Sequence, residues 1–193
     1  MMMLPQDEAA LDLRPDVAVL TVGLAAIAVV SATTLPFSTM IASTVLGGLM
    51  ISGADIDART LLLPDLITLS ALLCGLAAAP VLDPPQPLLA VAVAAARAAL
   101  AGVAVALLRW SYGAFRGREG LGWGDVKLAA AIGAWLPLAA VPMCFALATA
   151  AALIAVGFAR LRGRHVCRDL KIPFGAFLCP ALWLLFYANA VAN

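Results

Sequence analysis

The amino-acid sequence predicts an all-α membrane protein, a polytopic bundle of about seven transmembrane helices (six to eight). Of its 193 residues, 64% are hydrophobic and only 12% are charged, and the mean hydropathy is +1.04. Soluble domains have roughly 45–50% apolar and about 25% charged residues. The apolar runs are continuous instead of alternating, which argues against a β-barrel. Because each span takes about 20 residues, we expect residues 1–193 to form one transmembrane domain without a soluble domain.

The first four spans are separated by prolines and charges. Only Leu35-Pro36 divides the first span from the second, and the charged stretch 55–65 precedes the third. The third span ends before the Asp-Pro-Pro sequence at 83–85, and the fourth ends near Arg109. The predicted spans are 17–35, 37–54, 66–82 and 88–110.

The last three spans follow a glycine-rich stretch. The fifth begins after Gly124, and Pro137 and Pro142 mark its boundary with the sixth. A basic segment, 160–171, precedes the seventh. The short connections favour antiparallel neighbours. The predicted spans are 126–141, 142–159 and 172–191.

The loops predict the orientation of the chain. Alternate connections contain ten Lys or Arg residues, whereas those around 35–36, 80–87 and 137–142 contain none. By the positive-inside rule, the N-terminus and the basic connections face the cytoplasm, and with seven spans the C-terminus lies outside. The basic residues are Arg59, Arg109, Arg116, Arg118, Lys127, Arg160, Arg162, Arg164, Arg168 and Lys171.

The remaining composition predicts no metal, cofactor or nucleic-acid partner. The net charge is +1, so there is no global electrostatic attraction for nucleic acid. The four cysteines form no CxxC pair, and His165 is the sole histidine, so a zinc site lacks ligands. The N-terminal stretch is acidic instead of basic, so we expect no cleaved signal peptide.

Four aspartates mark the predicted cytoplasmic ends of the spans. Asp55, Asp57 and Asp65 lie between the second and third spans, and Asp125 lies at the start of the fifth. Carboxylates that border apolar spans are costly and indicate function by default. Two carboxyl groups in a partly desolvated site can share a proton, so that one activates water and the other protonates a carbonyl.

The glycines before Asp125 are compatible with more than one interpretation. Gly120, Gly122 and Gly124 let the backbone turn tightly and pass close to another segment. A phosphate-binding loop is not expected, because neither the preceding strand nor the longer glycine pattern is present. From spacing alone, a carboxyl pair and a flexible interfacial loop with a helix-capping Asp125 are equally favoured.

Three segments resemble the type IV prepilin peptidases, which are bacterial GxGD-type aspartic proteases. RGREGLGWGDVKLAAAIGAWL at 116–136 is similar to the signature of that family, and DARTLLLPDL at 57–66 is similar to its other acidic motif. KIPFGAFL at 171–178 is similar to the Pro-Phe-Gly segment of its last helix. The three segments occur in the order found in the family, and the resemblance covers about residues 40–180.

The resemblance implies that Asp57 and Asp125 are the catalytic pair. Asp57 is preferred to Asp55 because it stands eight residues before Asp65, which is the spacing in the family. We expect Asp65 to cap the third span, and Lys127 either to lower the pKa of Asp125 or to anchor the helix at lipid headgroups. The implied supporting residues are Gly122, Gly124, Glu119, Lys127, Pro64 and Asp65.

The resemblance also implies a substrate and a location. The family cuts type IV prepilins and pseudopilins, associated with pili and type II secretion, between a basic leader and an apolar N-terminal helix. The cut is made at the cytoplasmic face of the bacterial inner membrane, without cofactors. Larger members carry paired CxxC motifs and also N-methylate their product; because no CxxC occurs here, the sequence resembles a short form and methyltransferase activity is not expected.

Two other functions are compatible with the residues. Another GxGD protease, of the preflagellin-peptidase or signal-peptide-peptidase type, differs from this prediction in substrate and site of cleavage. A small transporter or structural subunit with acidic ion sites belongs to a different class of protein. A transporter is favoured by internal repeats, and none is evident.

Overall fold

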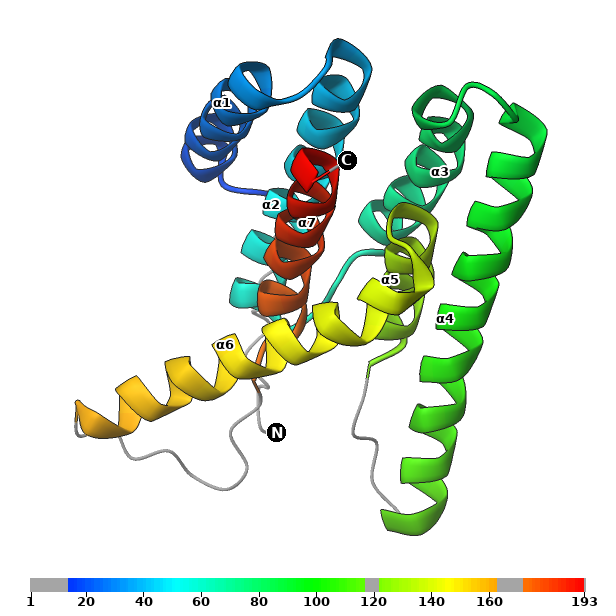
Figure 1. The fold of residues 1–193 in the computed structure, drawn as a ribbon. Coiled ribbons are helices and arrows are strands. Elements are labelled where there is room, and N and C mark those ends of the chain that lie inside the picture. Colours follow the sequence, from blue (N-terminus) through cyan, green and yellow to red (C-terminus); the bar gives the residue numbers. More distant parts are fainter. Residues whose placement is uncertain (1–13, 117–121, 163–171, 193) are drawn as a thin grey trace, which may run out of the picture.

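The computed structural model describes residues 14–116, 122–162 and 172–192. Within these ranges the secondary structure is helical, which confirms the predicted fold class (Figure 1). The elements are α1 (Val17–Thr34), α2 (Phe37–Thr60), α3 (Asp65–Leu82), α4 (Pro87–Arg116), α5 (Trp123–Trp135), the 3-10 turn η1 (Leu138–Ala140), α6 (Val141–Leu161) and α7 (Gly175–Ala192).

Six helices in the described part of the chain are long and apolar enough to cross a membrane: α1, α2, α3, α4, α6 and α7. The span predicted at 126–141 has the wrong bounds, because α5 has 13 residues and ends at Trp135. Such a helix is about 20 Å long, short of a hydrocarbon core of roughly 30 Å. The helix ends before Pro137, whose ring is incompatible with continuing it.

Two helices continue past their predicted ends. α2 runs to Thr60 instead of residue 54, and α4 runs to Arg116 instead of residue 110. The predictions stopped at the first charged residues, where the apolar run ends. A helix needs no apolar side chains once it leaves the hydrocarbon region, because its backbone hydrogen bonds are internal. Asp57 therefore lies on α2 itself.

The helices form two groups, with α6 running obliquely across them (Figure 1). The first helix group contains α1, α2 and α7, and the second contains α3, α4 and α5. Contacts between α2 and α3 join the two groups. Within the first group, the Ser31 and Ser43 hydroxyls lie 2.9 Å apart, and within the second, Trp135 Nε1 donates to the Ala71 carbonyl at 2.7 Å.

The short helix α5 lies at the centre of the bundle. Eight of its 13 residues are buried, and Leu128 and Ile132 are fully inaccessible. They belong to the same core cluster as Met50 of α2 and Leu178 and Leu182 of α7. Because α5 contacts α3, α4, α6 and α7, its N-terminus is positioned by tertiary packing.

One end of the bundle collects the segments that the sequence singles out. α2 finishes there, α3, α5 and α7 begin there, and α4 passes it before ending further on (Figure 1). We call it the basic end, because Arg59, Arg109 and Lys127 lie in the helical turns near it. Arg109 also stacks over the Trp123 ring, with its guanidinium carbon 4.9 Å from the ring centroid.

Candidate active site

Asp57 lies in the last turn of α2 and is 6% exposed. Its Oδ2 accepts a hydrogen bond of 2.8 Å from the backbone N–H of Ala176, in the first turn of α7. The approach of the two helices is close: a Cβ on Gly175 would lie 2.9 Å from both Cγ and Oδ2 of Asp57. Contacts this short do not occur for real Cβ atoms, so the carboxyl group occupies the space that a side chain at 175 would need.

The turn after Asp57 brings α2 to the glycine-rich loop. Leu61 has a left-handed backbone (φ 57°, ψ 22°), and its N–H donates to the Asp57 carbonyl at 2.8 Å. This conformation is costly for a residue with a Cβ and reverses the chain sharply. The segment between α2 and α3 then passes Gly124 of α5. A Cβ at Gly124 would lie 3.0 Å from Leu63 Cβ and 3.4 Å from the Leu63 carbonyl oxygen.

Asp125 occupies the first turn of α5, outside the six membrane-spanning helices. Its Oδ2 accepts a hydrogen bond of 3.3 Å from the N–H of Gly122. Burial raises the pKa of Asp125 to about 6, the Gly122 hydrogen bond opposes this rise, and the neighbouring Asp57 carboxylate adds to it. Asp125 thus makes a capping hydrogen bond at the start of α5 and also interacts electrostatically with a second carboxyl group, so the two interpretations left open by the sequence are compatible.

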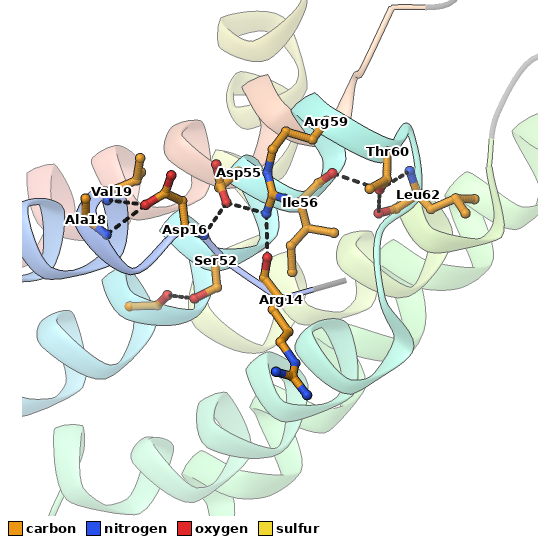
Figure 2. A network of polar contacts seen from close by, with 11 residues as sticks. Arg14, Asp16, Ala18, Val19, Ser52, Asp55, Ile56, Arg59, Thr60 and Leu62 are labelled. Atoms are coloured by element: carbon orange, nitrogen blue, oxygen red, sulfur yellow. Dashed lines mark hydrogen bonds and ion pairs between the residues drawn. The ribbon is translucent and has the colours of Figure 1, made fainter. Parts of the chain in front are cut away.

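Asp55 takes part in a different set of contacts, which Figure 2 shows. Its Oδ2 accepts hydrogen bonds from the Asp16 backbone N–H at 2.8 Å and from Arg59 Nη2 at 2.7 Å. Arg59 also donates to the Arg14 carbonyl oxygen. Asp55 therefore joins the end of α2 to the segment that precedes α1, and this role accounts for an acid two residues before Asp57.

The supporting residues are placed differently from the prediction. The N-cap of α3 is Pro64, without a side-chain capping hydrogen bond, so the predicted N-cap role of Asp65 is wrong, although Asp65 does lie in the first turn, where an acid is favourable. Asp65 instead pairs with Lys127 of α5, with 2.6 Å between Oδ1 and Nζ. The electrostatic partner of Lys127 is therefore Asp65, not Asp125. Glu119 lies outside the described residues.

The arrangement suits proton transfer between two carboxyl groups. Asp125 has a pKa near 6 and retains its proton over part of the physiological range, while Asp57 receives a backbone N–H that favours a fixed carboxylate orientation. Such a pair can activate a water and protonate a carbonyl oxygen in the same step. Among the described residues there is no group of three or more His, Cys, Asp or Glu side chains placed to hold a metal ion.

Comparison with known proteins identifies the family to which this chain belongs. The sequence pattern described as the type IV leader peptidase family matches residues 44–157, which include Asp57 and Asp125. The chain belongs to the type IV leader peptidase family. The match covers more than half of the chain and extends from α2 into α6.

Individual members of the family support the assignment. The prepilin leader peptidase/N-methyltransferase of Aeromonas salmonicida is 34% identical over 171 residues, which cover 86% of this chain and 55% of the relative. That of Aeromonas hydrophila is 34% identical over 159 residues, covering 79% and 51%. Leader peptidase HopD of Escherichia coli is 35% identical over 138 residues, covering 71% and 86%. No solved structure matches the chain.

The chain spans about half the length of the Aeromonas leader peptidases that it matches. The sequence analysis identified the segment at 171–178 only as a motif and assigned no role to its residues. In the structure, Gly175 and Ala176 of this segment contact Asp57 directly. The Pro-Phe-Gly motif was the sequence signal that could have pointed to these two residues. The contact itself joins Asp57 and Ala176 across 119 residues, and no local sequence pattern predicts such a contact.

Proposed function

We propose that this protein is a leader peptidase, an aspartic endopeptidase that removes the basic leader from a type IV prepilin or pseudopilin. The observation that carries the proposal is the electrostatic interaction between Asp57 of α2 and Asp125 of α5, in which the Asp57 carboxylate raises the pKa of Asp125 although the two helices belong to different groups. Membership of the type IV leader peptidase family supports it. So do the names of the relatives, which describe prepilin leader peptidases.

In the proposed reaction, the ionised carboxylate takes a proton from a water molecule whose oxygen attacks the carbonyl carbon of the scissile peptide bond. The protonated carboxyl group gives its proton to the carbonyl oxygen, forming a neutral tetrahedral intermediate. When the intermediate collapses, the C–N bond breaks and the leaving amine takes up the proton that came from the water. One hydroxyl group of the intermediate returns its proton to the other carboxylate as the new carboxyl group of the product forms. One carboxylate and one carboxylic acid remain, so the pair is ready for another cycle.

The proposed location is the bacterial inner membrane, with the carboxyl pair at the cytoplasmic face. The positive-inside rule supports this orientation, because Arg59 and Lys127 flank the same end of the bundle as Asp57 and Asp125. A substrate with a basic leader and an apolar helix suits this geometry. Its helix can remain in the bilayer while its leader lies in the cytoplasm.

The test is a leader-cleavage assay with the purified chain in detergent and a prepilin from the same organism. Asp57→Asn and Asp125→Asn should each lower the cleavage rate by about 100-fold or more, because each carboxyl group has a separate task. Asp83→Asn is the control, since Asp83 is an exposed residue at the far end of α3 and should leave the rate unchanged. Mass spectrometry of the products locates the bond that is cut.

The outcomes separate the functions left open by the sequence. Cleavage between leader and apolar helix, lost in both active-site variants, supports a leader peptidase. Cleavage inside the apolar helix indicates a protease of the signal-peptide-peptidase type, and faster cleavage of a preflagellin than of a prepilin indicates a preflagellin peptidase. A folded protein that cuts none of these substrates would contradict the proposal.

A further inference from the structure

We propose that Gly175 is a positioning residue, which lets the first turn of α7 hold the Asp57 carboxyl group in its reactive orientation. The inference rests on the proposed function, in which Asp57 is one of the two reacting carboxyl groups. The missing Cβ at Gly175 leaves room for the Asp57 carboxyl group, so the Ala176 N–H reaches Asp57 Oδ2 at 2.8 Å. The Gly175 amide also interacts favourably with the same carboxyl group.

The start of α7 is fixed by contacts other than Asp57. Phe174, directly before the helix, stacks on Phe145 of α6, with ring centroids 6.5 Å apart and an interplanar angle of 18°. One turn into the helix, Leu178 and Cys179 are completely buried. A methyl group added at Gly175 therefore cannot be accommodated by moving α7 away, because these contacts would be lost.

The backbone at Asp57 is equally constrained. Ile56 is 1% exposed, and the Asp57 carbonyl accepts the N–H of Leu61 in the left-handed turn that ends α2. The group with freedom to move is the Asp57 side chain, which has two torsion angles. A methyl group at Gly175 would displace the carboxyl group and break its hydrogen bond to Ala176. A general base must lie within hydrogen-bond reach of its water, so this displacement slows the chemical step.

The first experiment compares Gly175→Ala with Gly75→Ala in the cleavage assay. Gly75 is also buried, and a Cβ there would lie 2.8 Å from Trp135 Nε1 and 2.9 Å from Ala134 Cβ, so both variants place a Cβ less than 3.0 Å from a neighbouring side chain. Gly75 lies in α3, whose neighbour at that level is the last turn of α5, away from Asp125. We expect Gly175→Ala to lower kcat by about 10- to 100-fold with little change in KM. Gly75→Ala should keep kcat near that of the wild type.

A second variant removes the hydrogen bond without adding a side chain to the glycine. Ala176→Pro deletes the N–H that reaches Asp57, and proline is tolerated in the first turn of a helix. The variant should lower kcat as Gly175→Ala does. In both variants KM should stay near the wild-type value, because the change is confined to the orientation of the Asp57 carboxyl group. A general structural disturbance would change KM together with kcat.

A thermal double-mutant cycle tests the contact independently of activity. If the methyl group of Gly175→Ala collides with the Asp57 carboxyl group, truncating that group removes the collision. The loss of melting temperature caused by Gly175→Ala in the wild type should therefore disappear in the Asp57→Ala background. The loss caused by Gly75→Ala should be the same in both backgrounds.

The two readouts distinguish failure of this inference from failure of the proposed function. A wild-type chain that cleaves no leader would overturn the proposed function, while the thermal cycle would still decide whether Gly175 holds Asp57. An unchanged kcat in Gly175→Ala, or an equal melting-temperature loss with and without the Asp57 carboxyl group, would overturn the positioning role.

Discussion

The two carboxyl groups of the candidate site are held in different ways. Asp57 is tied to α7, a helix that begins more than 100 residues later in the sequence, through the Ala176 N–H and the close approach of Gly175. Asp125 is held within its own segment, by the N–H of Gly122 three residues earlier. The position of Asp57 thus depends on the packing of the first helix group, and that of Asp125 depends on the start of one helix.

Because of this difference, the Asp57 half and the Asp125 half of the site should respond differently to substitutions. Changes near Asp57 meet a rigid neighbour, because α7 is anchored by buried Leu178 and Cys179. A substitution at Asp125 affects a carboxyl group whose hydrogen-bond donor, the Gly122 N–H, belongs to the same segment and can move with it. The segment that follows α2 and the start of α5 approach closely where Leu63 lies against Gly124, so a side chain at residue 124 would push the two segments apart.

Lengthening each carboxyl side chain by one methylene gives the largest contrast. Asp57→Glu should lower kcat for leader cleavage by about 100-fold, since the longer side chain meets the first turn of α7. Asp125→Glu should cost only about tenfold, because its local donor can adjust. The measurement is steady-state cleavage of a prepilin by the two variants. Equal losses would show that the two carboxyl groups are held equally rigidly.

The contact between the two halves is tested by adding a methyl group at each glycine of the loop. Gly124→Ala should destabilise the protein by about 1–3 kcal/mol, because the new Cβ would lie 3.0 Å from Leu63 Cβ. Gly122→Ala is the matched control, since its nearest neighbours are at 3.6 and 3.9 Å and its φ of −73° suits alanine. Melting temperatures in detergent measure both effects. A similar loss in the two variants would contradict the close approach at Gly124.

The half-buried position of Asp125 predicts a pH-dependent stability. Its pKa is raised from 3.8 to about 6, so its contribution to folding is fully present below pH 4 and is lost as the pH rises through 6. Relative to Asp125→Asn, the wild type should lose on the order of 1–3 kcal/mol between pH 4 and pH 7. Thermal melts of both proteins across this range check the prediction. A pH-independent difference would mean that Asp125 is not desolvated.

The role of Asp55 is tested by Asp55→Asn. The variant weakens the contacts to Arg59 and to the Asp16 N–H, and should cost about 0.5–1.5 kcal/mol of stability. Cleavage should be retained, in contrast to Asp57→Asn. If cleavage were lost in the Asp55 variant and kept in the Asp57 variant, the choice of catalytic aspartate would be reversed.

The smallest effect is expected for the exposed ion pair between Asp65 and Lys127. A double-mutant cycle with Asp65→Asn and Lys127→Gln should give a coupling energy of about 0.2–1 kcal/mol, because both side chains are more than one third exposed. Melting temperatures at low and high salt measure it, and screening should reduce it. A larger coupling that resists salt would indicate that the pair is structurally important for the site.

The sequence by itself determined the membrane class, the order of the helices and the two segments that contain the acids. These features are local, since a run of about 20 apolar residues predicts a span whatever surrounds it. The motif at 116–136 likewise indicated Asp125, and the spacing between Asp57 and Asp65 indicated Asp57. The catalytic assignment of both aspartates stays a prediction until the variants are assayed.

The tertiary structure alone decided what each charged group contacts. Asp65 pairs with Lys127 instead of capping α3, Asp55 binds the segment before α1, and Asp57 is held by α7. None of these contacts follows from residue spacing, because each joins segments brought together by the burial of α5 or by the close packing of α2 against α1 and α7. Local patterns specify which helices form, whereas the packing of those helices specifies which atoms meet.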